Sequence, residues 1–246
     1  MKQCAFFLLA VSVLLAPAYF TQTEPDLIRS ASSLVVRTEV NSPCLAERAV
    51  SSKLETLSSA QSHSDQETAQ TELIHDAMKS PECRKLIVTA ILRAMNQPNV
   101  DLRHDTKSFY LWHYGSEILA SLKAEEALDL LIEHFDLDDG TPFPLNHHPA
   151  LVSVITMGSI AIPKLESVLM QNGNPNSRQY AVFCLASIGG SGAKKVLVQA
   201  LASESNKCVS SFIKASLDGF KTSKLHDQIG ADSRTDWYAA FLCNAQ

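Results

Sequence analysis

An acidic stretch near the middle of this 246-residue chain invites a calcium-binding interpretation. In FDLDDGTPF, residues 135–143, three carboxylates precede a glycine. An EF-type loop needs oxygen ligands at positions 1, 3 and 5 and a bidentate Glu at position 12. Counting from Asp136 puts Gly140 at position 5 and His147 at position 12, so the pattern fails. We interpret the stretch as an acidic loop between two helices, stiffened by its prolines.

Two adjacent histidines follow this loop. Together with the carboxylates of Asp136–Asp139, His147 and His148 could form a metal-dependent binding module, and we keep this as an alternative hypothesis. Neighbouring residues of a helix point in different directions, so the two imidazoles would need a further ligand to complete a site. The pattern instead favours Asn146 as the N-cap of a helix that begins at His147. The sequence predicts no cofactor and no metal.

Aromatic side chains are concentrated in FYLWHYGSE, residues 109–117. In a helix, Tyr110, His113 and Glu117 would share one side and the apolar residues the other. Such a stripe usually belongs to a core. Tyr110 and Trp112 are nevertheless candidates for a partner-binding surface, because exposed aromatic residues supply anchor contacts in interfaces. The chain contains no GxSxG, HExxH, Walker or Rossmann fingerprint, so catalysis has no positive support in the sequence.

The first 18 residues have the layout of a secretory signal peptide: Lys2, an apolar run and an Ala-x-Ala site at Ala18. The run is shorter than the roughly 20 residues that a spanning helix needs, so we expect cleavage and no membrane insertion. Cleavage removes one base and no acid, which changes 21 Lys and Arg against 26 Asp and Glu to 20 against 26. A mildly acidic chain without clustered basic residues is not expected to bind nucleic acid. We expect a secreted or periplasmic protein.

Five of the six cysteines remain after such cleavage, and an oxidising compartment permits disulfides. Cys44 and Cys83 each follow a Ser-Pro element at an apparent helix start, and we predict that they form a disulfide. Cys208 with Cys243 is a second candidate pair. Cys184 lies among apolar residues of a helix, which indicates a small buried side chain. Spacing alone does not determine the connectivity.

The sequence predicts helices throughout the part of the chain that positions these residues. We divide it into a helical N-terminal region at 19–105, a periodic region at 106–220 and a capping segment at 221–246. In the periodic region, helix ends with a small and an apolar residue recur at intervals of 35, 31 and 29 residues. They are Ser121-Leu122, Thr156-Met157-Gly158, Ser187-Ile188-Gly189 and Ser216-Leu217. Intervals of this size are typical of stacked helix pairs, which bury their apolar faces against one another.

The periodic region carries a family resemblance. RQYAVFCLASIG, residues 178–189, resembles the R-x-x-A-x-x-x-L-x-x-I-G first helix of short HEAT-like repeats related to those of phycobilin lyases, and AIPKLESVL, residues 161–169, resembles their second helix. The resemblance implies an all-α fold, an α-solenoid of stacked antiparallel helix pairs with a HEAT/ARM-like superhelix. Ala181 would allow close helix approach, and Gly189 would end its helix with a positive φ. The residues assigned to this structural role are Arg178, Ala181, Leu185, Ile188 and Gly189.

Repeat arrays of this kind present extended surfaces to partners, so we expect a non-catalytic scaffold for protein–protein interaction. Its partner-binding face is expected on the second helices of successive repeats. The candidates there are Lys164, Gln171, Lys195 and Gln199. An enzyme or enzyme-maturation factor of the lyase-related type stays as an alternative, which would require a deep pocket with a perturbed histidine or carboxylate.

The capping segment is expected to close the array. Asp232 or Ser233 can cap a final helix at 235–243, whose Trp237 and Phe241 would cover the exposed end of the stack.

Overall fold

Several helices of this protein begin at N-cap side chains that accept a hydrogen bond from the first turn. In the computed structural model, which describes residues 44–59, 62–98, 100–102, 104–137 and 148–222, Ser62 accepts from the backbone N–H of Asp65 at 3.3 Å. Ser80 accepts from the backbone N–H of Cys83 at 3.2 Å. Three later helices begin in the same way, at Asp105, Asn174 and Asn206. Each cap pairs a backbone donor that the helix itself leaves unpaired.

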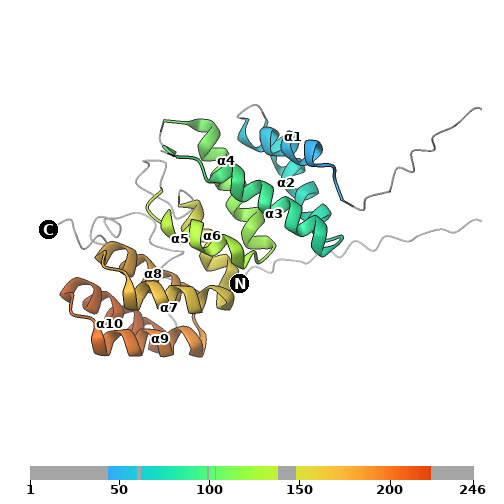
Figure 1. The fold of residues 1–246 in the computed structure, drawn as a ribbon. Helices are drawn as coiled ribbons and strands as arrows, with labels where there is room; N and C mark the ends of the chain where they lie inside the picture. The colour runs from blue at the N-terminus through green and yellow to red at the C-terminus, as the bar shows by residue number, and fades with distance from the viewer. Residues whose placement is uncertain (1–43, 60–61, 99, 103, 138–147, 223–246) are drawn as a thin grey trace, which may run out of the picture. The chain divides into compact units, whose positions relative to one another are not determined.

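Every element in the described part of the chain is a helix, so the predicted all-α fold class is confirmed there (Figure 1). The elements are α1 (Glu47–Ser58), α2 (His63–Ala77), α3 (Pro81–Met95), α4 (Thr106–Ser121), η1 (Glu125–Ala127), α5 (Leu128–Glu133), α6 (Pro149–Met157), η3 (Gly158–Ala161), α7 (Ile162–Gln171), α8 (Pro175–Ile188), α9 (Gly190–Ser203) and α10 (Lys207–Thr222). All of these elements belong to one compact unit, Asn41–Gln246.

The first three helices pack on one another and on α4. Their contact with α4 is close at Gly115, where an added Cβ would lie 2.9 Å from Sδ of Met95. A disulfide between Cys44 and Cys83 joins the segment that leads into α1, three residues before Glu47, to the first turn of α3. The N-terminal helices and the helices that follow α4 therefore share one continuous apolar core.

Beyond α4 the helices pack in a repeated pattern. The first helices of successive pairs contact one another, α4 with α6, α6 with α8 and α8 with α10, while α7 packs against α8 and α9 (Figure 1). Three predicted helix ends are confirmed, because α4 ends at Ser121, α6 at Met157 and α8 at Ile188. The fourth is wrong: Ser216 lies within α10 and is buried, and no glycine follows Leu217 directly to stop the helix.

Glycine ends two of these helices. Gly158 and Gly189 both have φ of 71°, which confirms the predicted positive φ at Gly189. Lys123 takes φ of 51° just after α4, so a non-glycine residue adopts a left-handed conformation at the corresponding turn. Its ammonium donates a hydrogen bond to the carbonyl oxygen of Thr156, near the end of α6, where a cation is favoured.

One run of helical residues in the described ranges, Pro149–Gln171, is long and apolar enough to cross a membrane by length and composition. Gly158 divides this run into α6 and α7. Both helices contribute buried side chains to the core, including Val154 and Leu165. α6 and α7 are therefore two separate helices that pack in the core.

Candidate functional site

The predicted partner-binding residues of α7 and α9 lie on one side of these two helices, away from the core. The buried side chains of α9 are Ala193, Val196, Leu197 and Ala200, and those of α7 include Leu165 and Val168. The residues between them in sequence are wholly or partly exposed. We call this set the second-helix surface; it consists of Lys164, Met170, Gln171, Lys195, Val198 and Gln199.

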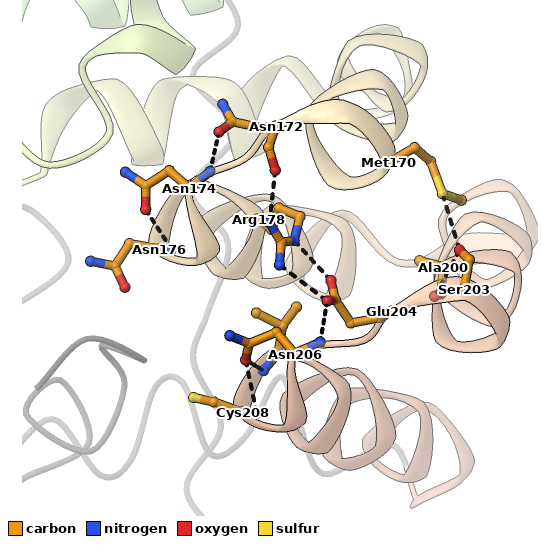
Figure 2. A network of polar contacts seen from close by, with 11 residues as sticks. Met170, Asn172, Asn174, Asn176, Arg178, Ala200, Ser203, Glu204, Asn206 and Cys208 are labelled. Carbon is orange, nitrogen blue, oxygen red and sulfur yellow. Dashed lines mark hydrogen bonds and ion pairs between the residues drawn. The ribbon is translucent and has the colours of Figure 1, made fainter. Parts of the chain in front are cut away.

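Three contacts place α5, α7 and α9 side by side. Nζ of Lys164 forms an ion pair with Asp129 of α5. At the other edge of α7, the hydroxyl of Ser203 donates to Sδ of Met170 at 3.9 Å, as Figure 2 shows. A Cβ added to Gly192 of α9 would lie 3.4 Å from the Ile162 side chain of α7. α7 therefore lies against α5 at Lys164 and against α9 at Met170 and Ile162.

The four predicted residues differ in solvent exposure and in whether they contact another side chain. Gln171, Lys195 and Gln199 are exposed. Lys164 is half-buried, with its ammonium held by Asp129, so its charge is partly neutralised. An exposed pair of this kind contributes little stability, and a partner could replace it at low cost.

Two residues of this surface were missed in the sequence. Among the residues that the structure describes, the large apolar side chains with exposed surface are Met78, Met170 and Val198. Two of the three lie on the second-helix surface, with 39% of Met170 and 53% of Val198 exposed. Helical spacing could have indicated that Val198 is exposed, because it follows Lys195 by three residues and therefore shares its side of α9.

The aromatic stretch of α4 is mainly a core element. Trp112 is 1% exposed, so the prediction that it lies on a partner surface is wrong. The reason is that α4 packs against α1, α2 and α3 as well as α6, which gives it a wide buried face. Tyr110 is half-buried, with its ring 5.4 Å from that of Phe109 in an edge arrangement. Tyr110 keeps some exposed surface and stays a candidate.

Behind Tyr110, a polar network joins α2 to α4. Nδ1 of His63 lies 2.7 Å from the hydroxyl of Tyr114, and that hydroxyl donates to Oε1 of Gln66 at 3.3 Å. Burial raises the pKa of Tyr114, and the nearby carboxylates of Glu67 and Glu117 raise it further. The phenol is thus neutral and buried, which suits a structural hydrogen bond and not a nucleophile or base.

Arg178 takes part in a polar network that joins α8 to the loops before α8 and α10 (Figure 2). Its Nε donates to Oε2 of Glu204 at 2.8 Å, and its Nη1 donates to the carbonyl oxygen of Asn172 at 2.7 Å. Glu204 also accepts from the backbone N–H of Asn206 at 2.7 Å. The loop before α8 is thereby fixed to the loop before α10. Ala181 and Leu185 of the same helix are fully buried.

The cysteines follow the predicted pattern where the structure describes them. Cys44 and Cys83 form the predicted disulfide. Cys184 is free and buried, and burial raises the pKa of its thiol well above the usual value, which makes it a poor nucleophile. Cys208 is disulfide-bonded, and its predicted partner Cys243 lies outside the described residues.

The metal hypothesis falls largely on residues 138–147, which lie outside the described ranges. Of its members, Asp136 is exposed and His148 is 7% exposed at the residue before α6. Asn146 and His147 lie outside the described residues, and the helix begins at Pro149, two residues later than expected. Within the part of the chain that the structure describes, no group of three or more His, Cys, Asp and Glu side chains could hold a metal ion.

A carboxylate with a shifted pKa lines one hollow at α1 and α2, beside Leu45 and Lys79. Burial alone would raise the pKa of Asp76, but hydrogen bonds from Lys79 and from the backbone N–H of Leu45 outweigh it and lower this pKa. Both carboxylate oxygens are therefore occupied by the protein itself. Asp76 holds the chain beside the disulfide to the end of α2, a structural task.

No protein-family model, no curated protein and no solved structure matches this chain.

Proposed function

We propose that this protein is an extracytoplasmic HEAT-like repeat protein that binds a protein partner without catalysis, through the second-helix surface. The repeated packing of first helices, with α7 and α9 beside them, supports a short α-solenoid. The Cys44–Cys83 disulfide, together with the signal-like layout of residues 1–18, supports an oxidising compartment.

The observation that carries the proposal is the placement of Met170 and Val198. Exposed apolar side chains that share one surface with polar residues are typical of protein-binding sites. Here the two apolar side chains lie among Gln171, Lys195 and Gln199, which can supply hydrogen bonds and charge at the edge of a contact. Burying the exposed apolar surface would contribute about 25 cal/mol per Å².

Site-specific photocrosslinking tests the proposal. A photoreactive residue is placed at Val198 in the full-length chain, and a second protein carries it at Met78 of α2, which is 77% exposed. Both proteins are expressed with the signal segment, and crosslinked products from the secreted or periplasmic fraction are identified by mass spectrometry. We expect a reproducible protein adduct from position 198 and none from position 78.

A competition variant sharpens the result. Met170→Glu/Val198→Glu should abolish capture of that adduct partner, whereas Met78→Glu should leave it unchanged, because both variants alter exposed side chains only. Equal capture by both variants, or adducts of equal yield from both positions, would contradict the proposed surface. Sequencing of the mature N-terminus checks the compartment, with Tyr19 expected as the first residue.

A further inference from the structure

We propose that Asn172 is a site of spontaneous covalent modification, at which the backbone nitrogen of Gly173 attacks the side-chain amide and the amide is converted to a carboxylate. Water is the only other reactant. The site lies in the loop between α7 and α8. The inference therefore does not depend on the identity of any partner.

The sequence places the two reacting groups next to each other. Asn172 is followed by Gly173, and the Asn-Gly pair occurs once in the 246-residue chain. A backbone nitrogen can close a succinimide ring on Cγ of the asparagine before it, and such an intramolecular attack is much faster than the same reaction between separate molecules. A side chain on the attacking residue hinders the approach, and glycine has none.

The structure leaves this pair open to the reaction. Both residues are exposed, so water and base reach them. Asn172 follows the last residue of α7 with an extended backbone, with φ of −74° and ψ of 126°. Nothing lies within 4 Å of a Cβ added to Gly173. This space allows the peptide plane between the two residues to rotate as the ring closes.

The side-chain amide of Asn172 is polarised by a neighbouring donor. Its Oδ1 accepts a hydrogen bond from the backbone N–H of Asn174 at 2.8 Å, as Figure 2 shows. Negative charge develops on this oxygen when the ring closes, and a donor at that distance stabilises the charge. The loop thus supplies the nucleophile, the electrophile and a hydrogen bond to the developing oxyanion.

The two neighbouring asparagines each lack one of these features. Asn174 precedes Pro175, whose backbone nitrogen carries no hydrogen and so cannot become the nucleophile. Asn176 is half-buried in the first turn of α8, where the helix fixes the backbone. Of the asparagines in this part of the chain, only Asn172 is therefore expected to react.

The reaction is balanced by water alone. The Gly173 nitrogen loses its proton to base and bonds to Cγ of Asn172. The bond between Cγ and the amide nitrogen breaks, and this nitrogen takes up a proton and leaves as ammonia. Water then opens the succinimide. Opening at Cγ gives aspartate, whereas opening at the main-chain carbonyl carbon gives isoaspartate, in which the chain continues through Cγ.

Both products add a negative charge beside Arg178. Its Nη1 donates to the main-chain carbonyl oxygen of Asn172 at 2.7 Å (Figure 2). In the isoaspartate product this oxygen belongs to a free carboxylate, which competes with Glu204 for the guanidinium. The modification therefore acts on the contact between α8 and the loop before α10.

Peptide mapping tests the proposal. The full-length protein is incubated in a mildly alkaline buffer made with ¹⁸O-labelled water, and it is then digested with trypsin in ordinary water. The peptide LESVLMQNGNPNSR, residues 165–178, contains the three asparagines. We expect ¹⁸O in a new carboxylate at residue 172, with residues 174 and 176 still amides. An isoaspartyl methyltransferase should methylate the incubated protein.

Two variants serve as controls. Gly173→Ala has room for its Cβ and no positive φ, so it should fold as the wild type does. Its methyl group hinders the attack, and the conversion should slow by about tenfold, which corresponds to a barrier about 1.4 kcal/mol higher. Asn172→Gln keeps an amide but requires a larger ring, so it should show no conversion over the same period.

The free peptide LESVLMQNGNPNSR, incubated in the same buffer, measures the effect of the fold. If residue 172 of the folded protein stays an amide in the time that the free peptide takes to convert, the fold protects the pair and the proposal is wrong. Conversion of Gly173→Ala at the wild-type rate would contradict the role of the glycine. Conversion at residue 174 or 176 in place of 172 would contradict the assignment of the site.

Discussion

Arg178 and Glu204 form a nearly buried ion pair that joins α8 to the loop before α10. Their side chains are 13% and 5% exposed, and two hydrogen bonds of 2.8 and 3.1 Å connect them (Figure 2). The third guanidinium nitrogen of Arg178, Nη1, donates to the Asn172 carbonyl oxygen in the loop before α8, and Oε1 of Glu204 also accepts from the backbone N–H of Asn206 in the loop before α10. Each charge is therefore matched within the pair and its loops.

Removing one charge of this pair should be costly. Arg178→Met leaves the Glu204 carboxylate buried without its cation, and we expect a loss of about 3–5 kcal/mol in the free energy of unfolding. Arg178→Met/Glu204→Leu should lose less than Arg178→Met alone, because no charge is then left unpaired. Urea denaturation of the wild type, both single variants and the double variant gives the coupling energy.

The matched control is an exposed ion pair of the same chemistry. Arg93 and Glu47 lie 3.7 Å apart, and their side chains are 74% and 71% exposed. Arg93→Met should change the free energy of unfolding by less than about 1 kcal/mol. A similar loss at both arginines would mean that burial does not govern the strength of the Arg178–Glu204 pair.

Asp76 should make stability depend on pH in the acid range. Because the folded state lowers its pKa, the folded state binds a proton more weakly than the unfolded state. The stabilisation is thus fully present above the unfolded pKa of about 3.9 and is lost as pH falls through the lower folded pKa. Asp76→Asn should reduce the free energy of unfolding by about 1.5–3 kcal/mol at pH 7.

The test is the difference between wild type and Asp76→Asn measured at several pH values. It should shrink below about pH 4, where the unfolded wild-type carboxylate is protonated. Glu55→Gln, at an exposed position of α1, serves as the control and should alter stability little at any of these values. A difference that stays constant down to pH 2 would argue against the hydrogen-bonded carboxylate.

Substitution of Gly158 should destabilise the fold because of its backbone conformation alone. It has φ of 71° and ψ of −138°, and nothing lies within 4 Å of a Cβ added there. Gly158→Ala should therefore lose about 1–3 kcal/mol through backbone strain and not through a clash. Gly173 also has open space around an added Cβ, without a positive φ, so Gly173→Ala should be neutral within about 0.5 kcal/mol. Thermal unfolding compares the two variants directly, and equal losses would refute the strain argument.

The Cys44–Cys83 disulfide should contribute strongly to stability. It joins residues 39 apart in sequence, and loop closure of that size gives about 2–4 kcal/mol. Cys44→Ala/Cys83→Ala should lower the free energy of unfolding by this amount in chemical denaturation. Addition of a reductant should then lower the free energy of unfolding of the wild type by more than that of the variant. An equal decrease in the two proteins would contradict the disulfide assignment.

Local patterns made part of this structure predictable. The Ser-Pro element before Cys83 marks the start of α3, where Ser80 is the N-cap, whereas α1 begins at Glu47, three residues after Cys44. The Cys44–Cys83 disulfide is nevertheless the predicted one. Gly189 was predictable for a similar reason, since a glycine at a helix end adopts a positive φ without strain. Ala181 and Leu185 belong to the repeat pattern, which a single sequence displays.

Features that depend on distant contacts were not predictable. Glu204 is 26 residues from Arg178 in a loop, and nothing within either helix indicates that they meet. Trp112 is a candidate in the sequence because exposed aromatic residues supply anchor contacts in interfaces, but α4 packs against α1, α2, α3 and α6 and Trp112 is buried. The sequence does not single out Met170 or Val198. Helical spacing places Val198 on the side of Lys195, whereas the exposure of Met170 is seen only in the structure.

The position of α4 has a consequence for how this protein unfolds. It packs against α1, α2 and α3 and also against α6, so the change from non-periodic to periodic sequence at residue 106 falls inside one shared core. Unfolding of the two regions should be coupled in a single cooperative transition. Trp112 is buried within this shared helix, and its fluorescence would report the loss of both regions at once.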